Sequence, residues 1–184
     1  YRGNVSCQGP RACYDESKRL GETLCYVYHN YYDVPVNIIR PFNIYGPGMS
    51  KYDYRMIPNL MRAAKENSQI CIYGDGTQTR TFCYIDDAID GIVRTFISGK
   101  PGNTYNIGRD NPEISMIKLV EAFNTIAPVP VDYRITPYPD SYPADEPRRR
   151  CPDISLARND LNYNPIVELS EGLAATLDWS IKQY

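Results

Sequence analysis

The stretch ETLCYVYHNYYDVPVNIIRPFNIYGPG, residues 22–48, places a helical pattern, a strand pattern and a loop one after another. Apolar and aromatic side chains recur at helical spacing and predict a helix over residues 11–32. A β-branched run follows at residues 34–39 and predicts a short buried strand. Gly46-Pro47-Gly48 can continue neither element, so the chain turns there. A helix, a buried strand and a loop in this order are typical of an α/β fold.

The rest of the chain repeats this alternation. We expect extended segments at residues 70–73, 79–85 and 104–107, and helices at residues 57–64, 86–98, 115–126, 154–161 and 169–183. Asp86 and Asp87 are expected to cap their helix, and Ser115 to open the next one, because short polar side chains accept hydrogen bonds from the first N–H groups of a helix. Residues 128–153 are rich in proline and are interpreted as a long functional loop or a linker.

The composition argues against several classes of protein. The formal net charge is -2, with acidic and basic residues interspersed, so neither a nucleic-acid-binding face nor a face for anionic membranes is predicted. No apolar run approaches the roughly 18 residues of a membrane span. The six cysteines are scattered and form no C-x-x-C pair, which favours a reducing compartment and a cytoplasmic protein.

Tyr14 and Lys18 lie four residues apart in GPRACYDESKRLGE, residues 9–22. Residues at this spacing share a helical face about 6 Å apart along the axis, so an ammonium group can stabilise a phenolate there. A free tyrosine has a pKa of about 10, and action as a base near pH 7 requires a pKa lower by roughly 3 units, or about 4 kcal/mol. Lysine can supply part of this shift and a cationic nicotinamide ring the rest, so a catalytic couple makes sense mainly beside NAD. The alternative is an ordinary pair of polar surface side chains.

The same helix carries two further patterns. Cys25 and His29 share a face, but two ligands do not make a zinc site, and no metal is expected. An aromatic row is formed by Tyr26, Tyr28, Tyr31 and Tyr32. It is interpreted either as a face that packs against a second copy of the chain or as part of the intramolecular core.

A glycine-rich phosphate-binding turn is missing from the sequence. An α/β protein that binds a dinucleotide needs an early strand, such a turn and a helix N-terminus for the pyrophosphate. Neither G-x-G-x-x-G nor G-x-x-G-x-x-G occurs here. We therefore expect the sequence to be the C-terminal part of a longer polypeptide whose N-terminal half binds NAD.

Ordered motifs identify a family. The sequence contains GPRACYDESKR, RPFNIYGPG, IYGDGTQTRTF and RRRCPDIS in this order. Over essentially its whole length it resembles the C-terminal portion of extended short-chain dehydrogenase/reductases that act on nucleotide sugars. Within them it is most similar to UDP-glucuronate decarboxylases.

The resemblance implies roles for the residues at matching positions. Tyr14 would be the catalytic base, and Lys18 would lower its pKa and also bind the nicotinamide ribose of NAD. Arg55 matches an arginine that helps to anchor the cofactor, although a solvent-facing helix arginine is the alternative.

The resemblance also implies a substrate site. Asn43 would contact the phosphates of the sugar nucleotide, or else simply end a strand. Tyr73 and Arg80 match the segment that holds the ribose and diphosphate, and a surface strand arginine is the alternative for Arg80. Arg150 would meet the diphosphate or the sugar carboxylate. Arg148 and Arg149 are interpreted as solvated charges.

Some residues depart from the decarboxylase pattern. Ser17 stands where these enzymes carry glycine, Cys151 replaces a usual lysine, and Gly48 a common arginine. The family's catalytic Ser/Thr would lie upstream. The reaction therefore stays open between decarboxylation, 4-epimerisation and 4,6-dehydration, all of which begin with oxidation to a 4-keto sugar.

For the fold, the resemblance implies late Rossmann elements (about residues 1–45 and 78–110) interleaved with segments of a smaller substrate-binding domain (about 46–77 and 111–184). It also implies a homodimer through the helix that carries Tyr14, and a UDP-sugar as the substrate. A hypothesis of another class is an inactive sugar-nucleotide-binding or dimerising fragment.

Overall fold

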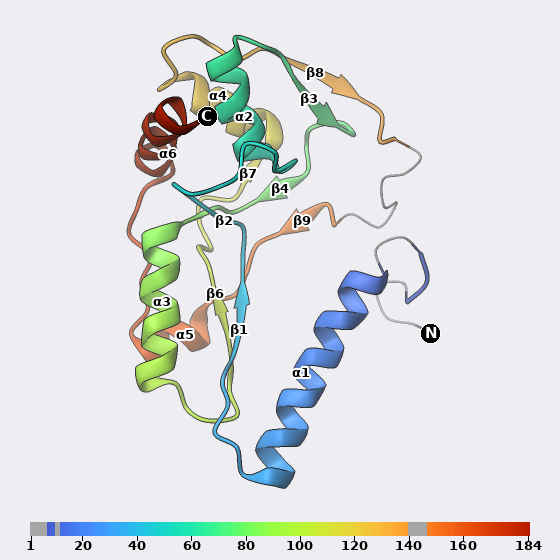
Figure 1. The fold of residues 1–184 in the computed structure, drawn as a ribbon, viewed down its shortest axis with the longest axis vertical. Helices are drawn as coiled ribbons and strands as arrows, with labels where there is room; N and C mark the ends of the chain where they lie inside the picture. The colour runs from blue at the N-terminus through green and yellow to red at the C-terminus, as the bar shows by residue number, and fades with distance from the viewer. Residues whose placement is uncertain (1–6, 10–11, 140–146) are drawn as a thin grey trace.

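The computed structural model describes residues 7–9, 12–139 and 147–184. Helix α1 (Ala12–Tyr32) leads through a loop into strand β1 (Ile38–Pro41), as Figure 1 shows. The other helices are α2 (Met56–Glu66), α3 (Ile85–Ser98), α4 (Met116–Asn124), α5 (Ser155–Leu161) and α6 (Leu169–Gln183). The other strands are β2 (Ile44–Tyr45), β3 (Ile70–Tyr73), β4 (Thr79–Arg80), β5 (Cys83–Tyr84), β6 (Thr104–Ile107), β7 (Ile114–Ser115), β8 (Tyr133–Thr136) and β9 (Arg149–Arg150). This alternation confirms the predicted α/β fold.

Strands β1 and β6 form a parallel pair in which Ile38 is opposite Thr104. The backbone N–H of Ile38 donates to Asn103, and that of Phe42 to Ile107. Because alternate residues of a strand point their backbone groups to opposite sides, the N–H and C=O of Ile39 face the other edge of β1. Within the described residues no strand pairs with that edge.

The remaining strands are short and form separate small sheets. β2 pairs with β5, and β3 with β8, both in parallel. β4 lies between β7, which is antiparallel to it, and β9, which is parallel. These sheets occupy the upper half of Figure 1, at the carboxyl end of β1.

Two hydrophobic cores hold the elements together. The larger one joins α2, β3, α4 and α6 through buried side chains that include Leu60, Met61, Leu119, Phe123 and Leu173. The second one joins β6, α3 and α5 through Ala88, Tyr105, Ile107, Ile154 and Tyr163. Helix α5 thus packs with β6, although it lies within the 111–184 segment that was expected to belong to the substrate-binding part.

Two strand predictions were wrong in their bounds. The strand expected at residues 34–39 runs from Ile38 to Pro41, because its only partner among the described strands begins at Thr104. Asp33, with a φ of 54°, ends α1, and the following residues form the connection. The extended segment expected at residues 79–85 is split into β4 and β5, which pair with different strands.

The described parts of the proline-rich segment, residues 128–139 and 147–153, contain strands, whereas a long loop or a linker was expected; residues 140–146 lie outside the described residues. Strand β8 pairs with β3, and β9 pairs with β4. The pairing partners lie far away in the sequence, and no local alternation marks a two-residue strand such as β9. Local patterns therefore could not predict either strand.

The expected cap of α3 is also wrong. Tyr84 occupies the N-cap position, and no side chain caps the helix. The buried carboxylate of Asp87 instead accepts hydrogen bonds from the backbone N–H groups of Ile166 and Val167, at 3.0 and 2.9 Å. Ser115 does cap α4, by accepting from the N–H of Lys118.

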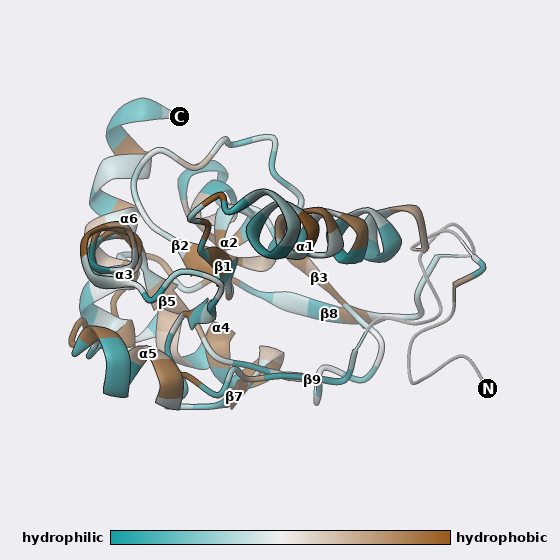
Figure 2. Cartoon of the chain, turned by 90° about the horizontal axis from the view of Figure 1, so that it is seen from below, coloured by the Kyte–Doolittle hydropathy of each residue, from teal (hydrophilic) through white to brown (hydrophobic). Residues whose placement is uncertain are grey.

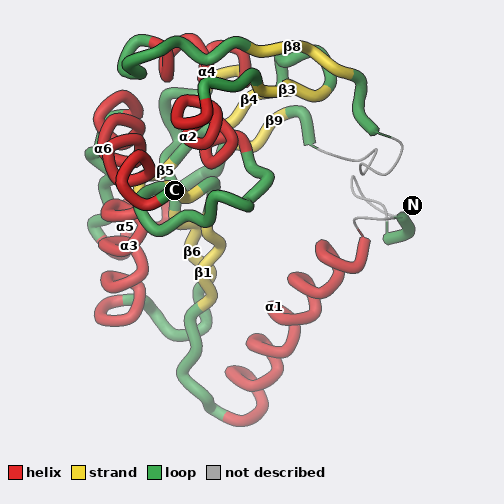
Figure 3. Tube along the Cα trace, turned by 45° about the horizontal axis from the view of Figure 1, so that its top comes forward, coloured by secondary structure: helices red, strands yellow, loops and turns green. Residues whose placement is uncertain are grey.

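Helix α1 projects away from the other elements in Figures 1 and 3. Ala12 is its only described residue that is buried, and the aromatic row at Tyr26, Tyr28, Tyr31 and Tyr32 is exposed. Figure 2 shows apolar segments along this helix. Among the helices that the structure describes, none combines the length and apolarity needed to cross a lipid bilayer.

Candidate active site

Tyr14 and Lys18 lie on one exposed face of the first turns of α1. The Lys18 Nζ is 5.5 Å from the centroid of the Tyr14 ring, and 55% of Tyr14 is exposed. The hydroxyl of Ser17 donates to the backbone carbonyl of Tyr14 at 2.7 Å, so it is bound within the helix. The arrangement puts an ammonium group beside a phenol that solvent can reach, which the predicted acid–base couple requires.

Helix α1 runs opposite to β1, so its first turns, which carry this pair, lie toward the same end of the molecule as the carboxyl end of β1, although the helix diverges from the strand (Figures 1 and 3). Ligands of α/β proteins bind at the carboxyl ends of parallel strands. Asn43 lies at the same end, two residues after β1. The Tyr14–Lys18 pair and Asn43 therefore lie toward the same end of the molecule.

Asn43 joins the end of β1 to the segment after β4. Its backbone is left-handed, with a φ of 44°, and its Nδ2 donates to the carbonyl of Thr81 at 2.8 Å. The N–H of Thr81 in turn donates to the carbonyl of Arg150 at 3.3 Å. Asn43 thus has a structural role, and its predicted phosphate contact remains a prediction.

Arg80 and Arg150 stand opposite each other on the neighbouring strands β4 and β9. Their side chains start from the same face of the sheet, since residues in register share a face. Arg80 is 7% exposed, and its Nη1 donates to the carbonyls of Thr79 and Arg148, at 2.8 and 3.2 Å. Two guanidinium groups that start side by side suit a diphosphate, because each can bind phosphate oxygens with two N–H groups.

Tyr73 ends β3 beside an aromatic residue that the sequence did not point to. Its ring stacks on that of Tyr138, with centroids 6.1 Å apart and planes inclined by 25°. Gly74 follows with a φ of 80°, and a Cβ there would lie 2.8 Å from the Tyr138 ring. Tyr138 was not predicted as a neighbour of Tyr73. Its position there depends on the pairing of β3 with β8, which no local sequence pattern indicates.

Arg55 lies apart from these residues, before α2. Its guanidinium binds Asp53 through Nε and Nη2, at 2.9 and 2.5 Å, and holds the pKa of that carboxyl below its usual range. The two residues line an open hollow of about 390 Å³ together with Ser50, Tyr52 and Tyr54. The predicted contact of Arg55 with the cofactor stays a prediction.

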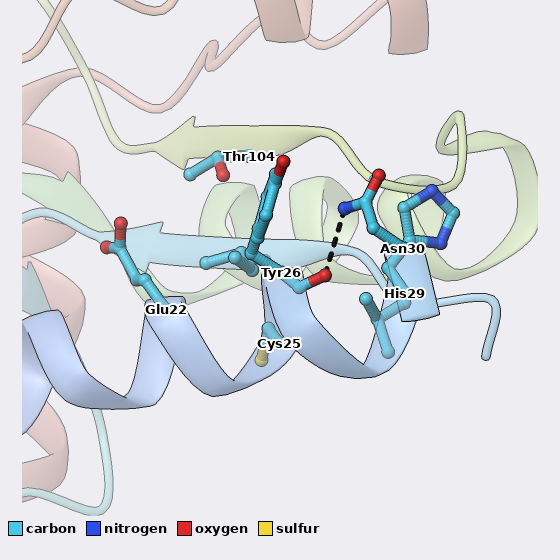
Figure 4. Close-up of a pocket in the computed structure, with 9 residues that line it drawn as sticks. Glu22, Cys25, Tyr26, His29, Asn30 and Thr104 are labelled. Carbon is cyan, nitrogen blue, oxygen red and sulfur yellow. Dashed lines mark hydrogen bonds between the residues drawn. The ribbon is translucent and has the colours of Figure 1, made fainter. Parts of the chain in front are cut away.

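A second hollow, of about 200 Å³, lies between α1 and the strands β1 and β6 (Figure 4). Its lining includes Glu22, Tyr26 and His29 from α1 and Thr104 from β6. These helix residues are about 12 to 22 Å from Tyr14 along the axis, at the other end of the strands. We therefore do not place the reaction there. Among the described residues no group of three or more potential metal ligands comes together.

Comparison with known proteins places these observations in a family. The model of the family described as "NAD dependent epimerase/dehydratase family" matches residues 2–108. UDP-glucuronic acid decarboxylase 3 of Arabidopsis thaliana is 39% identical over 174 residues, which cover 94% of this chain and 49% of that protein. UDP-glucuronic acid decarboxylase 1 of Xenopus tropicalis is 36% identical over 184 residues, which cover 100% of this chain and 42% of that protein.

Solved structures show the same fold. UDP-glucuronic acid 4-epimerase of Bacillus cereus, in complex with UDP-glucuronic acid and NAD, is similar with a TM-score of 0.84 and 34% identity, over 93% of this chain and 53% of that one. dTDP-glucose 4,6-dehydratase of Bacillus anthracis, in complex with NAD, has a TM-score of 0.82 and 25% identity, over 97% and 54% of the two chains. The chain spans about half the length of the relatives that it matches.

Proposed function

Because this chain belongs to the NAD dependent epimerase/dehydratase family, we propose that it carries the catalytic couple and the substrate site of an NAD-dependent UDP-glucuronate decarboxylase. The observation that carries the proposal is the Lys18 ammonium group 5.5 Å from the centroid of the exposed Tyr14 ring. The choice of substrate follows the similarity to two UDP-glucuronic acid decarboxylases.

The residues present fit one end of NAD. The exposed Tyr14 hydroxyl and Lys18 ammonium group offer hydrogen bonds to the nicotinamide ribose. Arg55 would anchor another part of the cofactor, and the sequence contains no glycine-rich turn for its pyrophosphate. When bound, NAD supplies the acceptor for the hydride of the sugar C4.

Tyr14 is the general base in this mechanism. Its phenolate takes the proton of the sugar 4-hydroxyl while C4 is oxidised to a ketone. Lys18 stabilises the phenolate across one helical turn and keeps the oxygen oriented. The ketone accepts the electron pair left when the bond between C5 and the C6 carboxylate breaks, so carbon dioxide leaves and an enolate forms. A proton taken up from water at C5 then gives the 4-keto pentose. Reduction of this ketone, with the proton returned by Tyr14, ends the cycle.

Asn43, Arg80 and Arg150 bind the substrate in this proposal. The two guanidinium groups hold the diphosphate, and Tyr73 lies against the nucleoside. This division leaves the first turns of α1, with Tyr14 and Lys18, for the sugar ring and places the two arginines on the phosphates. Binding energy gathered far from C4 then holds the 4-hydroxyl at Tyr14.

The second candidate is 4-epimerisation of UDP-glucuronate. It is favoured by the TM-score of 0.84 to UDP-glucuronic acid 4-epimerase. Both reactions begin with the same oxidation and differ in what happens to the ketone, which is either decarboxylated or turned over and reduced from its other face.

The test incubates the full-length protein with NAD and UDP-glucuronate and measures the mass of the sugar-nucleotide product. Loss of carbon dioxide supports the proposal, whereas a new isomer of unchanged mass supports epimerisation. Tyr14→Phe should lower turnover by about 100-fold or more. Tyr31→Phe, an exposed tyrosine on the same helix, is the matched control. Full activity of Tyr14→Phe would remove the basis of the mechanism, and binding without turnover by the wild type would favour a sugar-nucleotide-binding module.

We further propose that two copies of the protein pair through α1 and that the enzyme works in the cytoplasm. The exposed tyrosine row on α1 supports the pairing, because aromatic side chains with polar tips are common in interfaces. Sedimentation of the full-length protein tests it: a monomer, or a dimer unaffected by Tyr28→Glu with Tyr31→Glu, would contradict it.

A further inference from the structure

Glu113 connects all three strands of the small sheet that carries Arg80 and Arg150. It immediately precedes β7, and its carboxylate accepts a short hydrogen bond from the hydroxyl of Thr79 on β4. The same carboxylate accepts from Nε and Nη2 of Arg149 on β9, at 3.0 and 2.8 Å. The Thr79 hydroxyl and then the Arg149 guanidinium hold the pKa of the Glu113 carboxyl below its usual range.

This contact lies on the face of the sheet opposite to the two predicted diphosphate ligands. Thr79 is in register with Arg149, and Arg80 with Arg150. Since successive side chains of a strand point to opposite faces, Arg149 faces Glu113 while Arg150 starts from the face of Arg80. The three consecutive arginines thus have different partners, because Arg148 binds Asp75 at 2.7 Å.

Strand β9 offers few backbone groups for pairing, because it is only two residues long. The backbone N–H of Thr79 donates to the carbonyl of Arg148, just before β9, at 2.8 Å, and that of Thr81 donates to the carbonyl of Arg150 at 3.3 Å. A slip of one residue would move every side chain of a strand to the other face. In β9 such a slip would turn Arg150 away from Arg80 and bring Arg149 into its place, so the register decides which guanidinium meets the ligand.

We propose that Glu113 is a positioning residue: by binding Thr79 and Arg149 it fixes the register of β9 and so places Arg150 beside Arg80 for a nucleoside diphosphate. The inference rests on the proposed function, which names the ligand. It adds a residue that does not touch the substrate but sets how tightly the diphosphate binds.

The test measures UDP binding and steady-state kinetics with the full-length protein. Glu113→Gln should weaken UDP binding and raise KM about fivefold, with kcat within about twofold, because the charged contact that joins β9 to β4 is lost. The charge-swapped variant Glu113→Arg with Arg149→Glu should recover most of the affinity. Asp178→Asn, which breaks a remote exposed ion pair with Lys182, is the control and should change nothing.

A double-mutant cycle shows whether the effect passes through Arg150. In an Arg150→Ala background, Glu113→Gln should have no further effect on UDP affinity. An equal fivefold loss in that background would overturn the proposal, as would unchanged affinity of Glu113→Gln or a swapped variant no better than the single one.

Hydrogen exchange separates this proposal from the proposed function. The amides of Thr79 and Thr81 donate to the carbonyls of Arg148 and Arg150. Glu113→Gln should speed hydrogen exchange at these two amides and leave exchange at the amides of β6 unchanged. If the wild type binds no UDP, the proposed function fails, and the exchange result alone decides on the register. Unchanged exchange at Thr79 and Thr81 would overturn the role of Glu113.

Discussion

Gly172 is where α6 approaches two buried aromatic rings, and Gly172→Ala should destabilise the protein. A Cβ at this position would overlap the hydroxyl oxygen of Tyr45 and lie 3.0 Å from its Cζ and 2.9 Å from Cδ2 of Tyr84. Tyr45 is 2% exposed and Tyr84 9%, and their rings pack edge to face, 5.8 Å apart. Both rings are packed in the larger core, so the helix or the rings must shift to make room.

The magnitude follows from two opposing effects. Alanine gains about 1 kcal/mol over glycine in the interior of a helix. Overpacking a buried site costs about 1–3 kcal/mol, occasionally more, and overlap with a fixed hydroxyl on a rigid ring belongs at or beyond the upper end of that range. We expect a net loss of about 2 kcal/mol, which lowers Tm by about 4–8 °C for a domain of this size.

Thermal and urea unfolding of the full-length protein, followed by circular dichroism, measure this loss. Tyr45→Phe removes the overlapping oxygen together with its hydrogen bond to Leu169, which is 3.3 Å long and therefore weak. The variant with both substitutions should regain at least half of the stability lost by Gly172→Ala. Wild-type stability of Gly172→Ala, or a double variant less stable than the single one, would refute the reasoning.

Three further predictions concern ionisable groups. Arg158 holds the pKa of Asp110 below its usual range, so this pair stabilises the fold above the unfolded pKa of about 4, and its contribution is lost as pH falls through the folded pKa. Asp110→Asn should therefore flatten the fall of Tm below pH ~4. Asp87→Ala leaves the backbone N–H groups of Ile166 and Val167 without their acceptor and should lower the free energy of unfolding in urea by about 2–3 kcal/mol. A decrease below about 0.5 kcal/mol would show that the loop before α6 rearranges. Burial raises the pKa of the Cys83 thiol to about 11, so iodoacetamide at pH 8 should label exposed Cys13 within minutes and leave Cys83 unlabelled by mass spectrometry until urea unfolds the protein.

Local patterns predicted the parts of the fold that depend on neighbouring residues. Helices α1 and α6 follow from periodic apolar positions, and β6 was predicted with its observed bounds. Strand β9 could not be predicted, because its two arginines have no strand propensity and form a strand only against β4. Asp87 looked like a helix cap in the sequence, but its actual partners lie in a distant loop.

The same distinction holds for the candidate site. The face shared by Tyr14 and Lys18 follows from helical geometry and was predictable from their spacing. The juxtaposition of Arg80 with Arg150, and of Tyr73 with Tyr138, depends on register between strands far apart in sequence. The family resemblance named Arg80, Arg150 and Tyr73. Tyr138 was not named, and the pairing of β3 with β8 explains why it lies beside Tyr73.

The bare edge of β1 has a practical consequence for anyone who produces this polypeptide. The N–H and C=O of Ile39, which no described strand pairs, can bind a strand of another chain, and the tyrosine row of α1 is also exposed. Preparations of residues 1–184 by themselves should form soluble oligomers or precipitate as concentration rises. Absence of enzymatic activity in such a preparation would then reflect aggregation and would not test the role of Tyr14.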